Sequence, residues 1–250
     1  LSSVTTGHAK GAVHFPCHIP YNTEVYAKRC IGMRESDITV SGPSLFVGYA
    51  TGTNLMCPWA VGATTVLFPD RPTPRRLFEL VQKHKCTVLT NVPTLINKML
   101  AHEGDKPDLS TLRFMWSAGE ALPKDLHDRW DAEHGVPIID GIGSAESFHI
   151  YISNSPTDVK PGSLGRLVPG YTAKLLDDDG GPVQQGDVGT LWVGGDSAAL
   201  YYHNAYAKSK EHLRGGWIVS GDKFRQDAEG YWFYEGRGDD LIKSGGIYVS

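Results

Sequence analysis

The chain of 250 residues is long enough for one large domain or two small ones. With 40% hydrophobic and 10% aromatic residues it can form a packed core, which excludes a disordered chain. The net charge of −4 gives no general nucleic-acid footprint, and no apolar run is long enough to span a membrane. Four cysteines without CxxC spacing argue against a zinc site and favour reduced thiols in a cytoplasmic protein.

Residues 1–155 alternate helix and strand patterns. Thr73 and Pro74 form a helix start, a hydroxyl cap followed by proline at the first helical position. The sequence predicts strands over 37–41, 64–68, 86–90, 112–116 and 136–139, and helices over 19–33, 53–61, 93–102 and 123–134 besides the one from Pro74. This alternation predicts an α/β fold with a mostly parallel sheet and flanking helices.

Helical periodicity disappears after about residue 155. Short strands are expected over 172–176, 188–193, 217–220 and 232–234, separated by turn signals. We therefore expect a smaller β-rich subdomain, a distorted barrel, over residues 156–236. The chain begins inside a motif and stops in an expected strand, so we expect it to be part of a longer protein.

Two segments have the composition of a phosphate site. Residues 1–11, LSSVTTGHAKG, combine hydroxyl groups, glycine and Lys10, which are groups that bind a polyphosphate. In residues 140–146, DGIGSAE, a buried strand is expected to end at Asp140, glycines turn the backbone, and Glu146 follows where a carboxylate can bind Mg²⁺. Each segment alone is equally explained as a surface turn or a tight connection.

Two later segments carry charge beside glycine. Residues 216–222, GWIVSGD, are expected to close a strand at Asp222, whose carboxylate could accept hydrogen bonds from ribose hydroxyls. Residues 236–246, GRGDDLIKSGG, precede one more strand. Taken singly, the first is explained as a turn aspartate and the second as a solvated turn.

Together and in this order, the four segments resemble motifs of the adenylate-forming enzymes, which include acyl- and aryl-CoA synthetases, carrier-loading adenylation domains and luciferases. Residues 2–11 resemble the phosphate loop [ST]SGTTGxPKG, 143–146 the GxTE motif, 220–222 the TGD motif and 236–243 the GRxDDxIK hinge. Within the family, residues 117–123, 140–144, 149–154 and 220–223 look most like benzoate–CoA ligases. The resemblance covers the whole chain but only part of the family's length, so residues 237–250 would be the hinge and the start of a C-terminal lid.

The resemblance implies a role for each matching residue. The residues that would bind ATP are Thr5, Thr6, Gly7 and Lys10 at the phosphates, Gly119, Glu120, Ala121, Asp140, Gly141, Ile142 and Ser144 around the adenine side, and Asp222 and Arg237 at the ribose. Glu146 would bind Mg²⁺, and Asp239 would be the hinge between two lid positions. The aryl pocket would be bordered by Gly48, Tyr49 and His149, and the coenzyme A tunnel by Gly245 and Gly246.

The implied reaction converts an aromatic carboxylic acid, ATP and Mg²⁺ into an acyl-adenylate and pyrophosphate, and then transfers the acyl group to coenzyme A. A planar, apolar acid suits a pocket with an aromatic wall and one polar group. His149 would be that polar group, and a histidine bonded within the core is the alternative. The sequence leaves the oligomeric state open, with a homodimer among the alternatives.

The chain departs from the family pattern at three positions of its motifs. Val4 replaces a glycine that is free to adopt positive φ, Ala9 replaces a proline, and Ala145 replaces the threonine before Glu146. We predict weakened use of ATP. Gly48 stands where benzoate ligases carry a slightly larger residue, which could admit a ring substituent.

Two other functions are consistent with the motifs. One is an enzyme that loads an aryl acid onto a carrier protein, and the other is a degenerate protein that binds an aromatic ligand or a partner without catalysis. Val4 and Ala145 favour the degenerate protein. Against it stands the retention of five motif residues, Lys10, Glu146, Asp222, Arg237 and Asp239. We expect this chain alone to be inactive, because the lid that would exclude water is missing.

Overall fold

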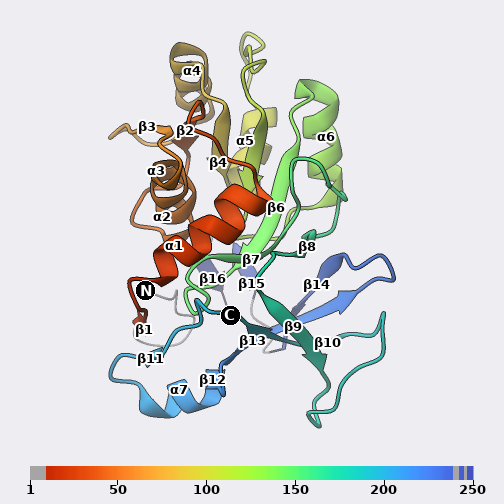
Figure 1. The fold of residues 1–250 in the computed structure, drawn as a ribbon. Helices are drawn as coiled ribbons and strands as arrows, with labels where there is room; N and C mark the ends of the chain where they lie inside the picture. The colour runs from red at the N-terminus through yellow and green to blue at the C-terminus, as the bar shows by residue number, and fades with distance from the viewer. Residues whose placement is uncertain (1–9, 239–241, 245–246, 250) are drawn as a thin grey trace.

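The computed structural model describes residues 10–238, 242–244 and 247–249. A seven-stranded sheet dominates the first half, in the order β3-β2-β4-β5-β6-β7-β8 (Figure 1). Its strands are β2 (Ile38–Ser41), β3 (Thr64–Val66), β4 (Val88–Asn91), β5 (Phe114–Ser117), β6 (Ile138–Gly143), β7 (Ile150–Ser153) and β8 (Arg166–Leu167). The pairs from β3 to β6 are parallel, and β7 and β8 are antiparallel, so the mostly parallel sheet is confirmed.

Helices flank this sheet as expected, although several of their bounds differ from the predicted ones. They are α1 (His18–Asn22), η1 (Thr23–Cys30), α2 (Gly48–Thr51), η2 (Gly52–Met56), α3 (Cys57–Ala60), α4 (Pro74–His84), α5 (Pro93–Leu100) and α6 (Lys124–His134). The expected cap of α4 is confirmed, since the Thr73 hydroxyl accepts a hydrogen bond from the Arg76 N–H at 3.2 Å. The helix expected over 53–61 begins earlier, at Gly48, and both η1 and η2 are π-helical, a wider form often found at functional sites.

Two hydrophobic clusters cover the two faces of the seven-stranded sheet. Alternation along β5 explains the division, because Phe114 and Trp116 point into one cluster and Met115 into the other. The cluster of Met115 also contains the apolar faces of α4, α5 and α6, which lie along one side of the sheet in Figure 1. The cluster of Trp116 continues through η1 into the second half of the chain, where Leu191 and Phe224 belong to it.

The prediction that a strand ends at Asp140 and turns at two glycines was wrong. β6 continues through Gly143, and neither Gly141 nor Gly143 has positive φ. Both pair with β7, Gly141 opposite Ser153 and Gly143 opposite Ile150. A Cβ on Gly143 would lie 2.2 Å from the His149 carbonyl oxygen, so these glycines are required by close strand pairing.

The second half is built on a five-stranded antiparallel sheet, as the β-rich expectation proposed. Its strands are β9 (Thr172–Leu176), β10 (Gly189–Gly194), β12 (Leu213–Arg214), β13 (Trp217–Gln226) and β14 (Trp232–Arg237). Two small antiparallel pairs accompany it, β1 (Ala12–Val13) with β11 (Tyr201–Tyr202), which are distant in sequence, and β15 (Ile242–Ser244) with β16 (Ile247–Val249).

Two predictions for this half were wrong. Helix is present, because α7 covers Tyr206–His212 and packs beside β11 and β13 (Figure 1). Asp222 does not close a strand, since β13 runs on to Gln226. Gly221, with φ of 74°, lies where the pairing of β13 with β10 shifts register, so the glycine marks a bulge inside the strand instead of a turn at its end.

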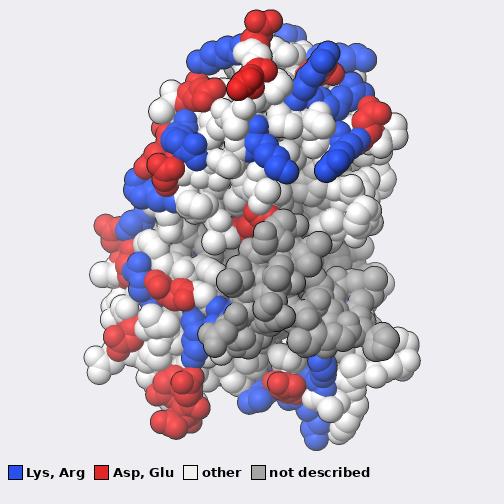
Figure 2. All heavy atoms as spheres, turned by 180° about the vertical axis from the view of Figure 1, so that it is seen from behind, with Lys and Arg blue, Asp and Glu red and all other residues white. Residues whose placement is uncertain are grey.

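The described surface carries mixed charge. In the rear view of Figure 2, Lys and Arg side chains are interspersed with Asp and Glu over the end of the molecule that carries α4, α5 and α6.

The thiols of Cys17, Cys30, Cys57 and Cys86 are free. Among the described residues, no helix combines the length and the apolar character needed to cross a membrane.

Candidate active site

The ends of β5 and β6 place two predicted nucleotide-binding segments side by side. Ser117, the last residue of β5, pairs with Asp140 in β6 in parallel register. Residues 118–121 therefore leave the sheet beside the last part of β6, which continues to Gly143. This is the edge where an open α/β sheet binds its ligand. Gly119 has φ of 91°, a conformation that favours glycine, and this lets the first segment turn directly after the strand.

Asp140 is a buried carboxyl group at this edge. Its side chain is 5% exposed, and Oδ1 has no hydrogen-bond partner among the described residues. Burial raises the pKa of Asp140 to about 8, against the opposing influence of the Ser117 hydroxyl and the Gly141 N–H. Because this pKa lies close to neutral pH, the carboxyl group can donate a hydrogen bond to a bound ligand when it is protonated and accept one from the ligand when it is not.

Glu120 has a structural partner. Its Oε2 atom accepts hydrogen bonds from the backbone N–H of Thr94 at 3.0 Å and from the Thr94 hydroxyl at 2.6 Å. Thr94 lies in the first turn of α5, where backbone N–H groups lack helical partners, so the carboxylate caps that helix. The side chain of Glu120 thus holds the segment 118–121 against α5.

The loop after β6 holds Glu146 at a fixed place. Ser147 is fully buried, and its hydroxyl donates to the carbonyl of His149 at 2.7 Å while accepting from the Ser144 N–H at 3.2 Å. The Glu146 carbonyl accepts from the Ala199 N–H at 2.7 Å. Its carboxylate oxygen Oε1 accepts from the Tyr202 hydroxyl at 2.6 Å. Both the main chain and the side chain of Glu146 are therefore anchored by residues of the second half.

Lys10 lies in the same charged neighbourhood. Burial lowers the pKa of Lys10, with Lys208 and Arg237 acting in the same direction and Glu146 and Glu211 acting against it. Its ammonium group lies 4.8 Å from the centroid of the Tyr202 ring. The fold thus brings together Lys10 and Glu146, which the sequence assigned to phosphate and metal.

Asp222 and Arg237, both predicted to bind the ribose, lie next to each other. They face each other in the antiparallel register of β13 and β14, and Nη1 of Arg237 lies 3.4 Å from Oδ1 of Asp222. Both side chains are largely buried, at 12% and 15% exposure. A carboxylate beside a guanidinium offers acceptors and donors to a pair of hydroxyl groups.

Two of the residues predicted to border an aryl pocket, Tyr49 and His149, pack together, whereas Gly48 is exposed. The ring of His149 stacks on that of Tyr49 at 6.3 Å between centroids and 17° between planes, and His149 is 4% exposed. Gly52 lies against this ring, because a Cβ there would be 2.2 Å from Nε2 of His149. Gly48 lies one helical turn earlier and faces open space, with no atom within 4 Å of an added Cβ.

His149 is an uncharged ring in this cluster. Its Nε2–H donates to the carbonyl oxygen of Tyr49 at 3.1 Å, and burial lowers its pKa to about 4. Nδ1 of His149 and the hydroxyl of Tyr49 are buried without a hydrogen-bond partner among the described residues. Two buried polar atoms beside a stacked aromatic pair suit a ligand with an apolar ring.

A magnesium ion would fit beside Glu146. Mg²⁺ is usually held by one or two carboxylates together with substrate phosphates, so a single anchored carboxylate near a lysine is an adequate protein contribution. The described residues contain no cluster of three or more His, Cys, Asp or Glu side chains for a metal held by protein alone. The fit therefore depends on a phosphate ligand being present.

Several predicted residues lie outside the described part of the chain. They are Val4, Thr5, Thr6, Gly7, Ala9, Asp239, Gly245 and Gly246. Conversely, sequence reasoning missed Tyr202, Ser147 and His14, whose Nε2 atom lies 2.7 Å from the carbonyl oxygen of Ala145. The contacts of Tyr202 and His14 join segments that meet only in the fold, whereas those of Ser147 are local but carry no motif that marks them.

The comparisons with known proteins identify the family of this chain. A family model described as AMP-binding enzyme matches residues 1–203, and the chain belongs to that family. It is 44% identical to a benzoate–CoA ligase of Thauera aromatica over 251 residues, covering 100% of this chain and 48% of the relative. The chain spans about half the length of the curated relatives it matches.

Solved structures show the same fold. The anthranilate–CoA ligase AuaEII in complex with anthranoyl-AMP superposes with a TM-score of 0.93 at 43% identity, covering 100% of this chain and 48% of that one. A benzoate–CoA ligase from Burkholderia xenovorans LB400 superposes with a TM-score of 0.87 at 37% identity, covering 96% of this chain and 54% of that one. The α/β fold with a β-rich second part is therefore the fold of adenylate-forming enzymes.

Proposed function

We propose that this chain is the ATP- and acid-binding core of an aryl-acid–CoA ligase. The observation that carries the proposal is the convergence of Lys10 and Glu146 on Tyr202, whose ring centroid lies 4.8 Å from the Lys10 ammonium and whose hydroxyl donates to Glu146 at 2.6 Å. A lysine, an anchored carboxylate and a ribose-type Asp–Arg pair are together the groups that ATP and a metal ion require. The phosphate-loop roles of Thr5, Thr6 and Gly7 remain part of this proposal.

The proposed reaction has two steps. A carboxylate oxygen of the acid attacks the α-phosphorus of ATP, the bond from that phosphorus to the bridging oxygen breaks, and pyrophosphate leaves with the electron pair. The thiol of coenzyme A then attacks the acyl carbon, loses its proton, and AMP leaves. Bound Mg²⁺ would offset the negative charge of the phosphates, and Lys10 would stabilise the same charge from the protein side.

The acid is proposed to be benzoate or a benzoate with a small ring substituent. Tyr49 and His149 supply a stacked aromatic wall, and open space beside Gly48 leaves room near the ring. The relatives support this class, since one is a benzoate–CoA ligase and a solved one is an anthranilate–CoA ligase. Because His149 is uncharged, we propose that it packs on the ring and does not pair as a cation with the carboxylate.

The remaining assignments belong to the same proposal. Asp239 would be the lid hinge and Gly245 and Gly246 would border the coenzyme A tunnel, all on residues outside the described part. Residues 1–155 would bind nucleotide and acid, while the β-rich part would supply Asp222 and Arg237 to the ribose. Four free thiols are consistent with the proposed cytoplasmic location.

The experiment is pyrophosphate release by the full-length protein with ATP, Mg²⁺ and a panel of benzoates, first without and then with coenzyme A. We expect release that depends on the acid, and AMP with a thioester once coenzyme A is added. Acid-dependent release with no thioester from coenzyme A would favour the carrier-loading alternative. Binding of an acid without any release would overturn the ligase and favour the degenerate binder.

A further inference from the structure

The Tyr202 side chain lies between the two groups that the proposed function assigns to ATP and its metal. Its hydroxyl donates to Oε1 of Glu146 at 2.6 Å, and its ring receives the Lys10 ammonium at 4.8 Å from the centroid. Tyr202 is 2% exposed, so these contacts are made in a largely water-excluded place. A hydrogen bond to a charged carboxylate is among the stronger ones in proteins.

The backbone around Tyr202 is tied to both partners. β11 pairs with β1, with Tyr202 opposite Ala12, two residues after Lys10. The N–H of His203 donates to the Gly11 carbonyl at 2.8 Å, and the N–H of Ala199, just before this strand, donates to the Glu146 carbonyl at 2.7 Å. The segment 199–203 therefore bridges the phosphate-loop side and the metal side of the site.

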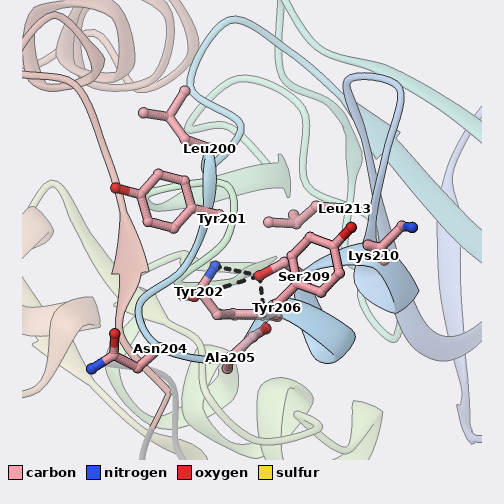
Figure 3. Close-up of a pocket in the computed structure, with 9 residues that line it drawn as sticks. All are labelled: Leu200, Tyr201, Tyr202, Asn204, Ala205, Tyr206, Ser209, Lys210 and Leu213. Atoms are coloured by element: carbon pink, nitrogen blue, oxygen red, sulfur yellow. Dashed lines mark hydrogen bonds between the residues drawn. The ribbon is translucent and has the colours of Figure 1, made fainter.

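A third set of contacts joins the backbone of Tyr202 to α7. Its N–H donates to the Ser209 hydroxyl at 2.9 Å, and that hydroxyl donates to the Ala205 carbonyl at 2.9 Å. Figure 3 shows these bonds at the edge of a pocket of ≈ 680 Å³ beside α7. Ser209 and Tyr202 are both buried, so the packing of α7 against β11 holds the backbone of Tyr202 in place.

Opposite charges so placed would attract each other. Burial lowers the pKa of Lys10 and the charge of Glu146 opposes that shift, so the two groups interact. A direct ion pair would compete with phosphate for the lysine and with metal for the carboxylate. The close partner of Glu146 is instead the Tyr202 hydroxyl, and that of Lys10 is the Tyr202 ring. The buried Tyr202 side chain thus contacts the Lys10 ammonium through its ring and the Glu146 carboxylate through its hydroxyl.

We propose that Tyr202 is a positioning residue that keeps Lys10 and Glu146 apart and orients Glu146 toward the metal of the ATP complex. This inference rests on the proposed function. Tyrosine supplies both requirements, since phenylalanine lacks the hydroxyl and an aliphatic residue lacks the ring. Side chains that hydrogen-bond a metal ligand typically change metal affinity by about 10–100-fold when removed.

The test uses Tyr202→Phe and Tyr202→Leu in the full-length protein, with Tyr201→Phe as the control. Tyr201 is the neighbour on the same strand and is 48% exposed, so its hydroxyl can be removed without disturbing the buried contacts. Binding of Mn²⁺ to the protein–ATP complex is measured by electron paramagnetic resonance without any acid, and ATP affinity is measured separately in EDTA. Thermal unfolding checks that each variant is folded.

For Tyr202→Phe we expect Mn²⁺ affinity to fall by roughly 10-fold or more, with metal-free ATP affinity unchanged because the ring remains under Lys10. Tyr202→Leu should lower both, and Tyr201→Phe neither. Unchanged Mn²⁺ affinity in a folded Tyr202→Phe protein, or unchanged metal-free ATP affinity in Tyr202→Leu, would overturn the inference. Because these readouts need no turnover, a wild type that binds Mn²⁺–ATP but never releases pyrophosphate would refute the ligase alone.

Discussion

Gly52 should not tolerate a side chain, although it lies in a helical segment where alanine is normally favoured. An added Cβ would lie 2.2 Å from Nε2 and 2.3 Å from Cδ2 of His149, more than 1 Å inside ordinary contact. The His149 ring cannot move aside freely, since Tyr49 and Tyr26 pack against it at 6.3 and 5.7 Å and Nε2 is bonded to the Tyr49 carbonyl. Gly52→Ala therefore forces either the ring or η2 to shift.

The size of the effect follows from two opposing terms. Overpacking of a core costs about 1–3 kcal/mol, and an overlap above 1 Å against a ring held on both sides belongs at the upper end. Replacing glycine by alanine inside a helix raises the free energy of unfolding by about 1 kcal/mol. The net destabilisation is about 2 kcal/mol, which lowers Tm by roughly 4–8 °C for a domain of this size.

The assay is differential scanning calorimetry of the full-length protein together with benzoate binding followed by tryptophan fluorescence. Gly48→Ala is the matched control, because it lies one turn earlier with no atom within 4 Å of the new Cβ, and its Tm should be unchanged or slightly raised. Gly52→Ala should cost little stability when it is introduced into His149→Ala and compared with His149→Ala alone, since the clash is then absent. A Gly52→Ala protein as stable as Gly48→Ala, with normal benzoate binding, would refute the packing argument.

The remaining predictions concern pH, ATP and substrate range. Burial raises the pKa of Asp140 in the folded protein to about 8, so the wild type should lose stability as the pH rises from about 4 to about 8. The Tm of Asp140→Asn should therefore rise relative to that of the wild type over this range and stay level above it. A Tm difference that is constant with pH would contradict this. Because the pKa of His149 is lowered to about 4, benzoate affinity should show no histidine titration between pH 5.5 and 8, and an inflection near 6.5 that disappears in His149→Gln would contradict it. Val4→Gly with Ala145→Thr should tighten ATP binding in calorimetric titration, and an unchanged affinity would refute the predicted weakness. Gly48→Ala should reduce pyrophosphate release with ring-substituted benzoates more than with benzoate itself, and an equal effect on both would argue against space for a substituent at Gly48.

The parts of the fold that were predictable from the sequence depend on local signals. The start of α4 follows from Thr73 and Pro74, and the parallel sheet follows from strands that alternate with helices. Two motifs implied that Asp222 and Arg237 would bind the same ribose, and the antiparallel register of β13 and β14 places them opposite each other. In each case the deciding residues are close together in the chain or belong to a motif of fixed order.

The parts that were not predictable depend on contacts between distant segments. Tyr202 meets Glu146 only because β11 pairs with β1 and the chain before it bonds to the loop after β6. The charge state of His149 depends on burial by Tyr26 and Tyr49, so its residue type alone suggested a polar group for a carboxylate. Neither burial nor strand partner can be read from spacing within a single segment.

The glycines near Glu146 show how a motif can be correct while its physical explanation is not. Glycine in a ligand-binding loop is expected to supply positive φ, yet Gly141 and Gly143 are extended and lie inside β6. Their small size lets β7 approach, and that approach places the His149 carbonyl where the buried Ser147 hydroxyl can reach it. Ser147 then closes the loop that carries Glu146. The position of the proposed metal-binding carboxylate therefore depends on strand packing behind it, so a methyl group at Gly143 should disturb Glu146 without touching ATP.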